Sequence, residues 1–275
     1  MDEKDVIKKL SEAKLDGIQM PARKSALKNA LINAAVKKGG APVFSVKKLS
    51  PVLIGLLAVA GAALYVVDNF DDGDKFNKNG GVWSTYSDAQ ENGDSHVWPD
   101  AGHTVSENFI MSQPGTGGTG FAARITGYTG AAFGLNYNYL GVVVRFSEKS
   151  SCPTCEGVDV KKYSGIKFSV KGKLEGGQLH FILPYESGEC VADRKTCKSL
   201  TNYADFENDI TARVHEDWST VIINFRTDLK QPGWTPKDSE AVIEKVLANV
   251  HLFKWQYKNG SGKVMDLWID DLVLF

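Results

Sequence analysis

The chain has 275 residues, is 43% hydrophobic and carries a formal net charge of −1. The charge is uneven, because residues 1–51 hold eleven Lys and Arg against five Asp and Glu, which leaves the part after residue 67 acidic. An acidic domain lacks the basic footprint that nucleic-acid phosphates require, so nucleic acid is excluded as a partner.

Residues 52–67, VLIGLLAVAGAALYVV, contain no charged side chain and predict one membrane crossing. At about 1.5 Å per residue the run is short for a hydrocarbon core of about 30 Å, so we place the transmembrane helix at residues 49–67. A buried core helix and a cleavable signal peptide are the alternatives. Lys-rich flanks stay in the cytoplasm, so we expect a single-pass protein of a bacterial inner membrane, with residues 68–275 periplasmic or extracellular.

Residues 1–48 form a basic arm ahead of this segment. Apolar residues recur at helical spacing among lysines at residues 6–10 and 26–35, which predicts two short cytoplasmic helices. Helices of this size cannot build a core alone. The arm is therefore interpreted either as a solvated or membrane-surface segment or as a docking site for a cytoplasmic protein partner.

After the membrane segment the hydrophobic period changes to two, which is typical of strands. The expected strands are residues 81–86, 121–125, 141–146, 165–170, 179–183, 218–225, 250–257 and 264–275, separated by Gly- and Asn-rich turns. One helical segment, residues 238–247, interrupts them. The pattern predicts an all-β, two-sheet sandwich over residues 68–275.

All four cysteines follow the membrane segment, in what the charge rule makes an oxidising compartment. We expect two local disulfides, Cys152–Cys155 and Cys190–Cys197. A zinc site is an alternative, but the second pair lacks the tight C-x2-C spacing and no His is close in sequence. A redox-active C-x-x-C is a third interpretation, but it needs a helix N-terminus that the flanking residues do not predict.

Catalytic motifs are weak. Residues 115–120 match the dinucleotide fingerprint G-x-G-x-x-G, but they are not followed by a helix, and neither G-x-S-x-G nor H-E-x-x-H occurs. Two carboxylates on facing strands could make a glycoside hydrolase without any sequence spacing, so that class stays open as a less favoured function. We expect no catalysis.

Carboxylates gather at both ends of the predicted sandwich, at residues 68–74 and 266–271. Hard oxygen ligands of this kind suit calcium. A solvated acidic turn explains the same residues equally well.

Several segments together resemble the galactose-binding-like jelly rolls, and among these the family 11 carbohydrate-binding modules. They are VDNFDDGD at 67–74 with GVW at 81–83, GGTGFAA at 117–123, YSGIKF at 163–168 and DLWIDD at 266–271. The resemblance covers about residues 68–275. It implies a two-sheet jelly roll and matches Cys190 and Cys197 to a cysteine pair that precedes a W-x6-F strand in related domains.

The resemblance also implies a structural calcium where the first and last strands meet, for which we take Asp72, Asp74 and Asp270, and it implies binding of polysaccharide. Such modules are normally appended to a glycoside hydrolase, whereas this one follows a predicted membrane anchor. We therefore expect a non-catalytic, membrane-anchored module that binds a poly- or oligosaccharide at the cell envelope. The alternative is a protein-interaction or assembly module.

The aromatic platform for sugar is expected in the strand at 250–257. By alternation, His251, Phe253, Trp255 and Tyr257 share one face, and Val250 and Leu252 on the other face suit burial. The reverse assignment of the two faces stays open. The predicted ligand residues are Trp255, Tyr185 and Trp234 as the platform, with Asp228 and Glu186 as polar partners.

Overall fold

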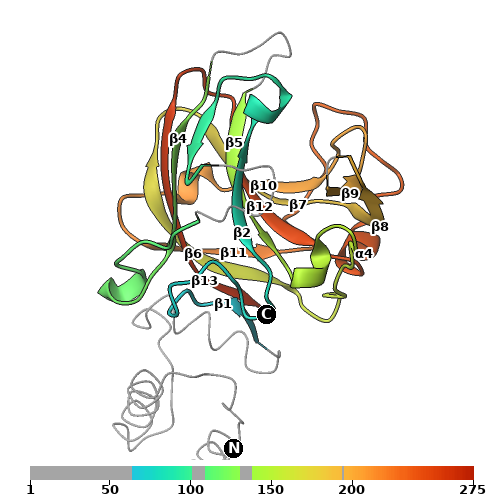
Figure 1. The fold of residues 1–275 in the computed structure, drawn as a ribbon, viewed down its shortest axis with the longest axis horizontal. Coiled ribbons are helices and arrows are strands. Elements are labelled where there is room, and N and C mark those ends of the chain that lie inside the picture. Colours follow the sequence, from blue (N-terminus) through green and yellow to red (C-terminus); the bar gives the residue numbers. More distant parts are fainter. Residues whose placement is uncertain (1–63, 101–108, 131–137, 194) are drawn as a thin grey trace, which may run out of the picture. The chain divides into compact units, whose positions relative to one another are not determined.

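The computed structural model describes residues 64–100, 109–130, 138–193 and 195–275 (Figure 1). All of these belong to one compact unit, Gly61–Phe275. The predicted arm at residues 1–48 and residues 49–63 of the predicted transmembrane helix lie outside the described residues. Within the described ranges, no helix is both long and apolar enough to cross a membrane.

Two large antiparallel sheets form a sandwich, so the prediction of an all-β, two-sheet architecture is confirmed. The first sheet has the order β11 (Ser219–Asn224), β6 (Gly165–Leu174), β13 (Val264–Leu274), β4 (Ala123–Tyr128) and β3 (His96–Trp98), and β1 (Tyr65–Asp68) also pairs with β13. The second has the order β10 (Phe206–Asp209), β7 (Gln178–Leu183), β12 (Leu252–Lys258), β5 (Tyr139–Arg145) and β2 (Trp83–Ser87). We call these sheet A and sheet B.

Smaller elements connect the strands. A separate hairpin pairs β8 (Glu186–Val191) with β9 (Thr196–Ser199). The short helices are η2 (Asp88–Glu91), η3 (Thr116–Gly118), η4 (Glu148–Ser150), η5 (Thr211–Arg213) and α4 (Ile243–Leu247). The helix α4 is shorter than the predicted residues 238–247. The amide of Gln231 donates to the Asp238 and Ala241 carbonyls, and this holds the preceding segment as a loop.

The core lies between the two sheets and is rich in aromatic rings. Phe253, Trp255 and Tyr257 of β12 are fully buried, and the Trp255 ring centroid lies 5.7 Å from that of Trp83 on β2. The ring centroid of Phe181 on β7 lies 5.4 Å from that of Trp255. Strand alternation sends every second residue of β12 into this core, so the residues between them must face outward.

The first strand corrects one predicted boundary. Tyr65 and Val66 pair with Leu274 and Val273 of β13, and the Val67 side chain is fully buried in the core. Residues 65–67 therefore belong to the sandwich, and the prediction that they end a membrane helix is wrong. Hydrophobicity alone did not separate the apolar membrane candidate from the apolar strand that follows it directly.

Candidate functional site

The outward face of sheet B carries a group of buried and half-buried polar and aromatic side chains, which we call the polar face. Its members come from five strands or the loops next to them: Tyr86, Tyr139, His180, Asp205, Glu207, Lys254, Gln256 and Lys258. Lys254, Gln256 and Lys258 alternate along β12 with the core residues Phe253, Trp255 and Tyr257. The composition of this face suits contact with a polar ligand.

Tyr86 is at the centre of the contacts on one half of the polar face. Its hydroxyl donates to Gln256 Oε1 at 3.0 Å, and Lys254 Nζ lies 4.7 Å from the centre of its ring. The Tyr139 ring on the neighbouring strand lies 6.0 Å from the Tyr86 ring at a tilt of 44°. Gly141 is the register partner of Tyr86 on β5, and an added Cβ there would come 2.5 Å from the Tyr86 hydroxyl oxygen. The glycine therefore allows the Tyr86 ring to lie across the sheet.

The charged groups of this half influence one another. Burial lowers the pKa of Lys254, while the carboxylates of Asp205 and Glu186 oppose that shift. Burial raises the pKa of Asp205, whose carboxylate accepts from the Tyr185 backbone N–H at 2.9 Å. A cation and carboxylates with little water around them offer strong hydrogen bonds to a ligand that brings hydroxyl groups.

Glu207 holds the other half of the polar face together. Its carboxylate pairs with Lys258 Nζ at 2.8 Å and lies 3.3 Å from His180 Nδ1. Burial raises the pKa of Glu207, but the hydrogen bonds from His180 and Lys258 outweigh it and the net shift is downward. Glu207 is therefore ionised at neutral pH.

The predicted polar partner Glu186 lies at the border of the polar face. Its carboxylate pairs with Arg145 Nη1 at 2.9 Å and lies 3.6 Å from His251 Nδ1. Burial raises the pKa of Glu186 against the opposing effect of Arg145. Burial, together with Arg145, lowers the pKa of His251 to about 4, so this ring is neutral at pH 7. Glu186 also influences the polar face, because its negative charge raises the pKa of Lys254.

The structure does not bring the other predicted ligand residues together in one site. Trp255 is fully buried, so the prediction that it forms a sugar platform is wrong. The reverse assignment of the strand faces is correct for residues 253–257, but Val250 and Leu252 are buried as well. Tyr185 is half-buried, with Lys245 Nζ 5.2 Å from its ring centre. Trp234 is 61% exposed in the loop before α4. Asp228 is half-buried and accepts from the Asn224 backbone N–H at 2.8 Å, which stabilises the turn after β11.

Sequence reasoning missed Tyr86, Tyr139, Lys254 and Gln256. A signal for two of them was present, because Lys254 and Gln256 alternate with three aromatic residues, and alternation of charge with aromatic rings favours the rings as core. Tyr86 and Tyr139 had no such signal. They come together only because β2 pairs with β5, and these two strands are far apart in the sequence.

Acidic side chains at the junction of β1 and β13 are occupied by local hydrogen bonds. Asp270 Oδ2 accepts from the Thr116 backbone N–H at 2.6 Å, and Asp74 Oδ1 accepts from the Phe76 N–H at 2.7 Å. Among the described residues, the converging groups of three or more possible ligands do not include Asp72, Asp74 or Asp270. Calcium binding by Asp72, Asp74 and Asp270 stays a prediction. Asp270 lies against the glycine loop at residues 115–120, where an added Cβ on Gly115 would come 2.8 Å from its Oδ2. Asp71 lies against the same loop, where an added Cβ on Gly120 would come 2.6 Å from its Oδ1.

All four cysteines are in disulfides, as predicted, but the predicted pairing is wrong. The bonds join Cys152 to Cys190 and Cys155 to Cys197, with Cα–Cα distances of 5.4 and 5.6 Å. Cys190 and Cys197 are register partners across the β8–β9 hairpin. Each takes its partner from the loop at residues 151–155, so the bonds join two separate segments instead of closing two small rings.

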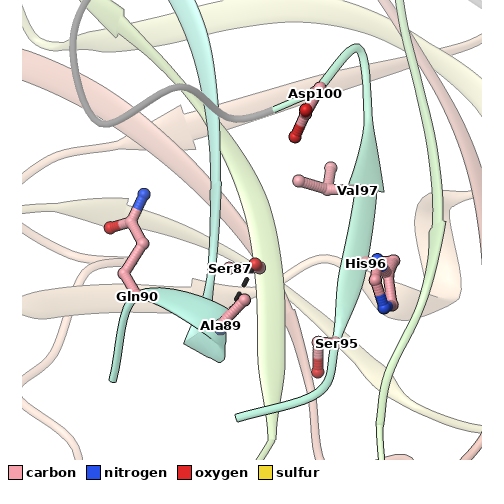
Figure 2. Close-up of a pocket in the computed structure, with 7 residues that line it drawn as sticks. All are labelled: Ser87, Ala89, Gln90, Ser95, His96, Val97 and Asp100. Carbon is pink, nitrogen blue, oxygen red and sulfur yellow. Dashed lines mark hydrogen bonds between the residues drawn. The ribbon is translucent and has the colours of Figure 1, made fainter. Parts of the chain in front are cut away.

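A small pocket lies beyond the end of β2, between η2 and β3 (Figure 2). It has a volume of about 130 Å³ and is lined by Ser87, Ala89, Gln90, Ser95, His96, Val97 and Asp100. Ser87 caps η2 there, its hydroxyl accepting from the Ala89 N–H at 3.4 Å. Small-molecule sites usually measure roughly 300–1,000 Å³, so this pocket is too small to compete with the polar face as the candidate site.

Comparisons with known proteins give structural likenesses only. No family model and no curated protein matches the chain. A family 11 carbohydrate-binding module of a cellulosomal cellulase of Clostridium thermocellum is 17% identical, with a TM-score of 0.48, over 78% of this chain and 96% of that chain. A family 11 module from Clostridium thermocellum in complex with a β-1,3-1,4-mixed-linked tetrasaccharide is 19% identical, with a TM-score of 0.47, over 78% and 97%. A family 30 carbohydrate-binding module is 13% identical, with a TM-score of 0.38, over 66% and 90%.

Proposed function

We propose that the domain is a jelly-roll module that binds a poly- or oligosaccharide chain on the polar face, without catalysis. The observation that carries this proposal is the pair of Tyr86 and Tyr139 on the outward face of sheet B, beside Lys254 and Gln256. Tyrosine rings offer apolar faces to the C–H groups of a sugar, and amide and charged groups bond its hydroxyls. A shallow sheet face also admits a long chain, which a closed pocket would not.

Two carboxylates near this face, Glu207 and Glu186, are held in ion pairs, which suits a binding role. A glycoside hydrolase needs one carboxyl group kept protonated as an acid and a second poised as a base or nucleophile. Here Glu207 is held ionised by Lys258 and His180, and Glu186 is paired with Arg145. These pairings suit groups that orient a ligand.

Placement at the cell envelope is part of the proposal. Disulfides persist in oxidising compartments, and the two in this domain favour a periplasmic or extracellular location. The uncharged run at residues 49–64, which ends before β1, and the basic arm ahead of it would anchor the chain in the inner membrane, with the arm available to a cytoplasmic partner.

A second candidate function is a protein-interaction module, favoured by a different surface. On β3 and β4 of sheet A, Trp98 is 51% exposed and Tyr128 is 47% exposed, with the His96 and Tyr128 rings 5.0 Å apart. Aromatic residues are enriched at protein interfaces. This surface supplies the matched control for the sugar test.

The test measures retention of the full chain by a polysaccharide array, with mixed-linked β-1,3-1,4-glucan as the first probe. Tyr86→Ala should weaken binding about tenfold, which corresponds to about 1.4 kcal/mol and suits the loss of one stacked ring. Tyr128→Ala removes an exposed tyrosine from sheet A and should bind as the wild type does. Failure of the wild type to bind any glycan would refute the proposal. Loss of binding in Tyr128→Ala alone would move the site to sheet A.

A further inference from the structure

We infer that the outward face of sheet A is a second binding surface, whose ligand is a linear polysaccharide carrying carboxylate or sulfate groups. The surface is centred on β6 and β13, and we call it the basic face. Its members are Arg124, Lys167, Lys171, Lys173, Trp218 and Trp268. It lies on a different sheet from the polar face, so the inference adds a second ligand class to the proposed function and does not depend on it.

Three lysines form a row along the outward side of β6. Because Phe168 and Val170 are fully buried in the core, strand alternation turns the residues on either side of them outward. These outward residues include Lys167, Lys171 and Lys173. At about 3.4 Å per residue, the Cα atoms of Lys171 and Lys173 are about 7 Å apart along the strand, and Lys167 lies about 14 Å from Lys171. A row of cations along an extended strand suits the repeated anionic groups of an extended polymer.

The positive charge of this row is not neutralised within its own sheet. The Asp266 carboxylate accepts two hydrogen bonds from Arg124, at 3.0 and 2.8 Å, so it is already paired. Asp270 is buried and bound to the glycine loop. Within the described ranges, the ion pairs do not include Lys167 or Lys171. On a domain that is acidic as a whole, two such cations on one face favour an anionic ligand.

Two tryptophans hold the central lysine of the row in place. Lys171 Nζ lies 4.4 Å from the centre of the Trp268 ring and 4.8 Å from that of Trp218. Trp268 of β13 has Lys171 of β6 and Arg124 of β4 as its register partners on either side, and the Arg124 guanidinium carbon lies 4.9 Å from the same ring centre. Cations and rings therefore alternate across the sheet. A lysine held between two rings has little side-chain freedom left to lose when it pairs with an anion.

The combination of rings and cations favours a glycan over other anions. Trp218 and Trp268 are half-buried, so each keeps part of its surface open to the C–H groups of a sugar. A sugar with an acidic substituent presents those C–H groups and an anion in one monomer, and therefore uses both features of the basic face together. A bilayer with anionic lipids also attracts basic and aromatic side chains, so the experiment includes a lipid surface as the alternative.

The experiment measures retention of the full chain on polygalacturonate, alginate and chondroitin sulfate. The first two carry carboxylates and the third also carries sulfate, so the panel separates the two kinds of anion. Methyl-esterified polygalacturonate keeps the same backbone without the charge, and it should bind at least about tenfold more weakly because the ion pairs to the lysine row are lost. Retention of the charged polymers should also fall as salt is raised from about 0.05 to 0.5 M, because salt screens exposed charges.

Lysine variants place the binding on the basic face. Lys171→Gln should weaken retention of the anionic polymers about fivefold, the upper range for one partly exposed ion pair. Lys167→Gln should weaken it in the same direction and leaves the contacts between Lys171 and the tryptophans unchanged, so it serves as the test if Lys171→Gln does not fold. Lys198→Gln is the matched control, because it removes an exposed lysine from the β8–β9 hairpin, and it should bind as the wild type does.

The two faces are tested separately. Tyr86→Ala should keep the anionic polymers, and Lys171→Gln should keep mixed-linked glucan, so failure of the proposed function and failure of this inference give different results. Equal retention of polygalacturonate and its methyl ester would overturn the inference. So would wild-type retention by both Lys171→Gln and Lys167→Gln, or no retention of any polymer in the panel. Weaker binding of Lys171→Gln to phosphatidylglycerol vesicles, with retention of polygalacturonate unchanged, would assign the face to a lipid surface and overturn it as well.

Discussion

Truncation of Trp255 tests the assignment of the two faces of β12. The side chain is fully buried between rings of both sheets, with Phe168, Phe181 and Trp83 at centroid distances of 5.3, 5.4 and 5.7 Å. Removing a buried Trp side chain leaves a cavity and typically costs about 3–5 kcal/mol. At about 2–4 °C per kcal/mol for a domain of this size, Trp255→Ala should lower the melting temperature by roughly 6–20 °C.

The assay is thermal unfolding followed by circular dichroism, with glycan retention measured in parallel. Trp234→Ala is the control, because this ring is 61% exposed and surface changes usually stay within about 0.5 kcal/mol. The melting temperature of Trp255→Phe should lie between those of Trp255→Ala and Trp234→Ala. The indole Nε1 has no hydrogen-bond partner among the described residues, so phenylalanine loses volume but no bond. The reasoning fails if Trp255→Ala melts like the wild type but no longer binds glycan, since only a surface platform behaves in that way.

Three further predictions concern charge, metal and cross-links. Burial raises the pKa of Asp68 to about 7, and burial together with Asp271 raises that of Asp270 to about 6. The stability that the protonated carboxyls contribute is therefore complete below about pH 4 and is lost as pH rises through 6 to 7. His251, with its pKa of about 4, acts in the opposite sense, so the measurement is the difference between wild type and Asp68→Asn, which should grow between pH 5 and 8 in denaturant titrations. Calcium at the junction of β1 and β13 remains a proposal: EDTA should lower the melting temperature of the wild type but not of Asp270→Asn, and an unchanged wild type would count against the site. Peptide mapping of unreduced protein should find Cys152 linked to Cys190 and Cys155 linked to Cys197, whereas linked Cys152 and Cys155 would refute the pairing in the structure.

The sequence predicted the sandwich because period-two alternation is a local property. Strands such as β6 and β12 bury every second residue, and that pattern is visible without knowing which strands pair. The disulfide pairing, in contrast, depends on which segments the fold brings together. Proximity in sequence favoured Cys190 with Cys197, but residues opposite each other on a hairpin can both turn toward a third segment. The boundary between the membrane segment and the first strand was mispredicted for a similar reason. The apolar residues of β1 continue the apolar run before them, and only their pairing with β13 identifies them as a strand.

The candidate site could be predicted only in part, and β12 shows why. Assigning Phe253, Trp255 and Tyr257 to a ligand face required three large rings to face solvent while Lys254 and Gln256 were buried. Burying those two polar groups without partners would cost several kcal/mol, whereas burying the rings is favourable, so the alternation already favoured the reverse assignment. In the structure the rings fill the core, and Lys254 and Gln256 contact Tyr86 on the polar face. The same residue order therefore decides both where the core lies and where a sugar chain would bind, but the tyrosines that complete the site come from strands that only the fold brings together.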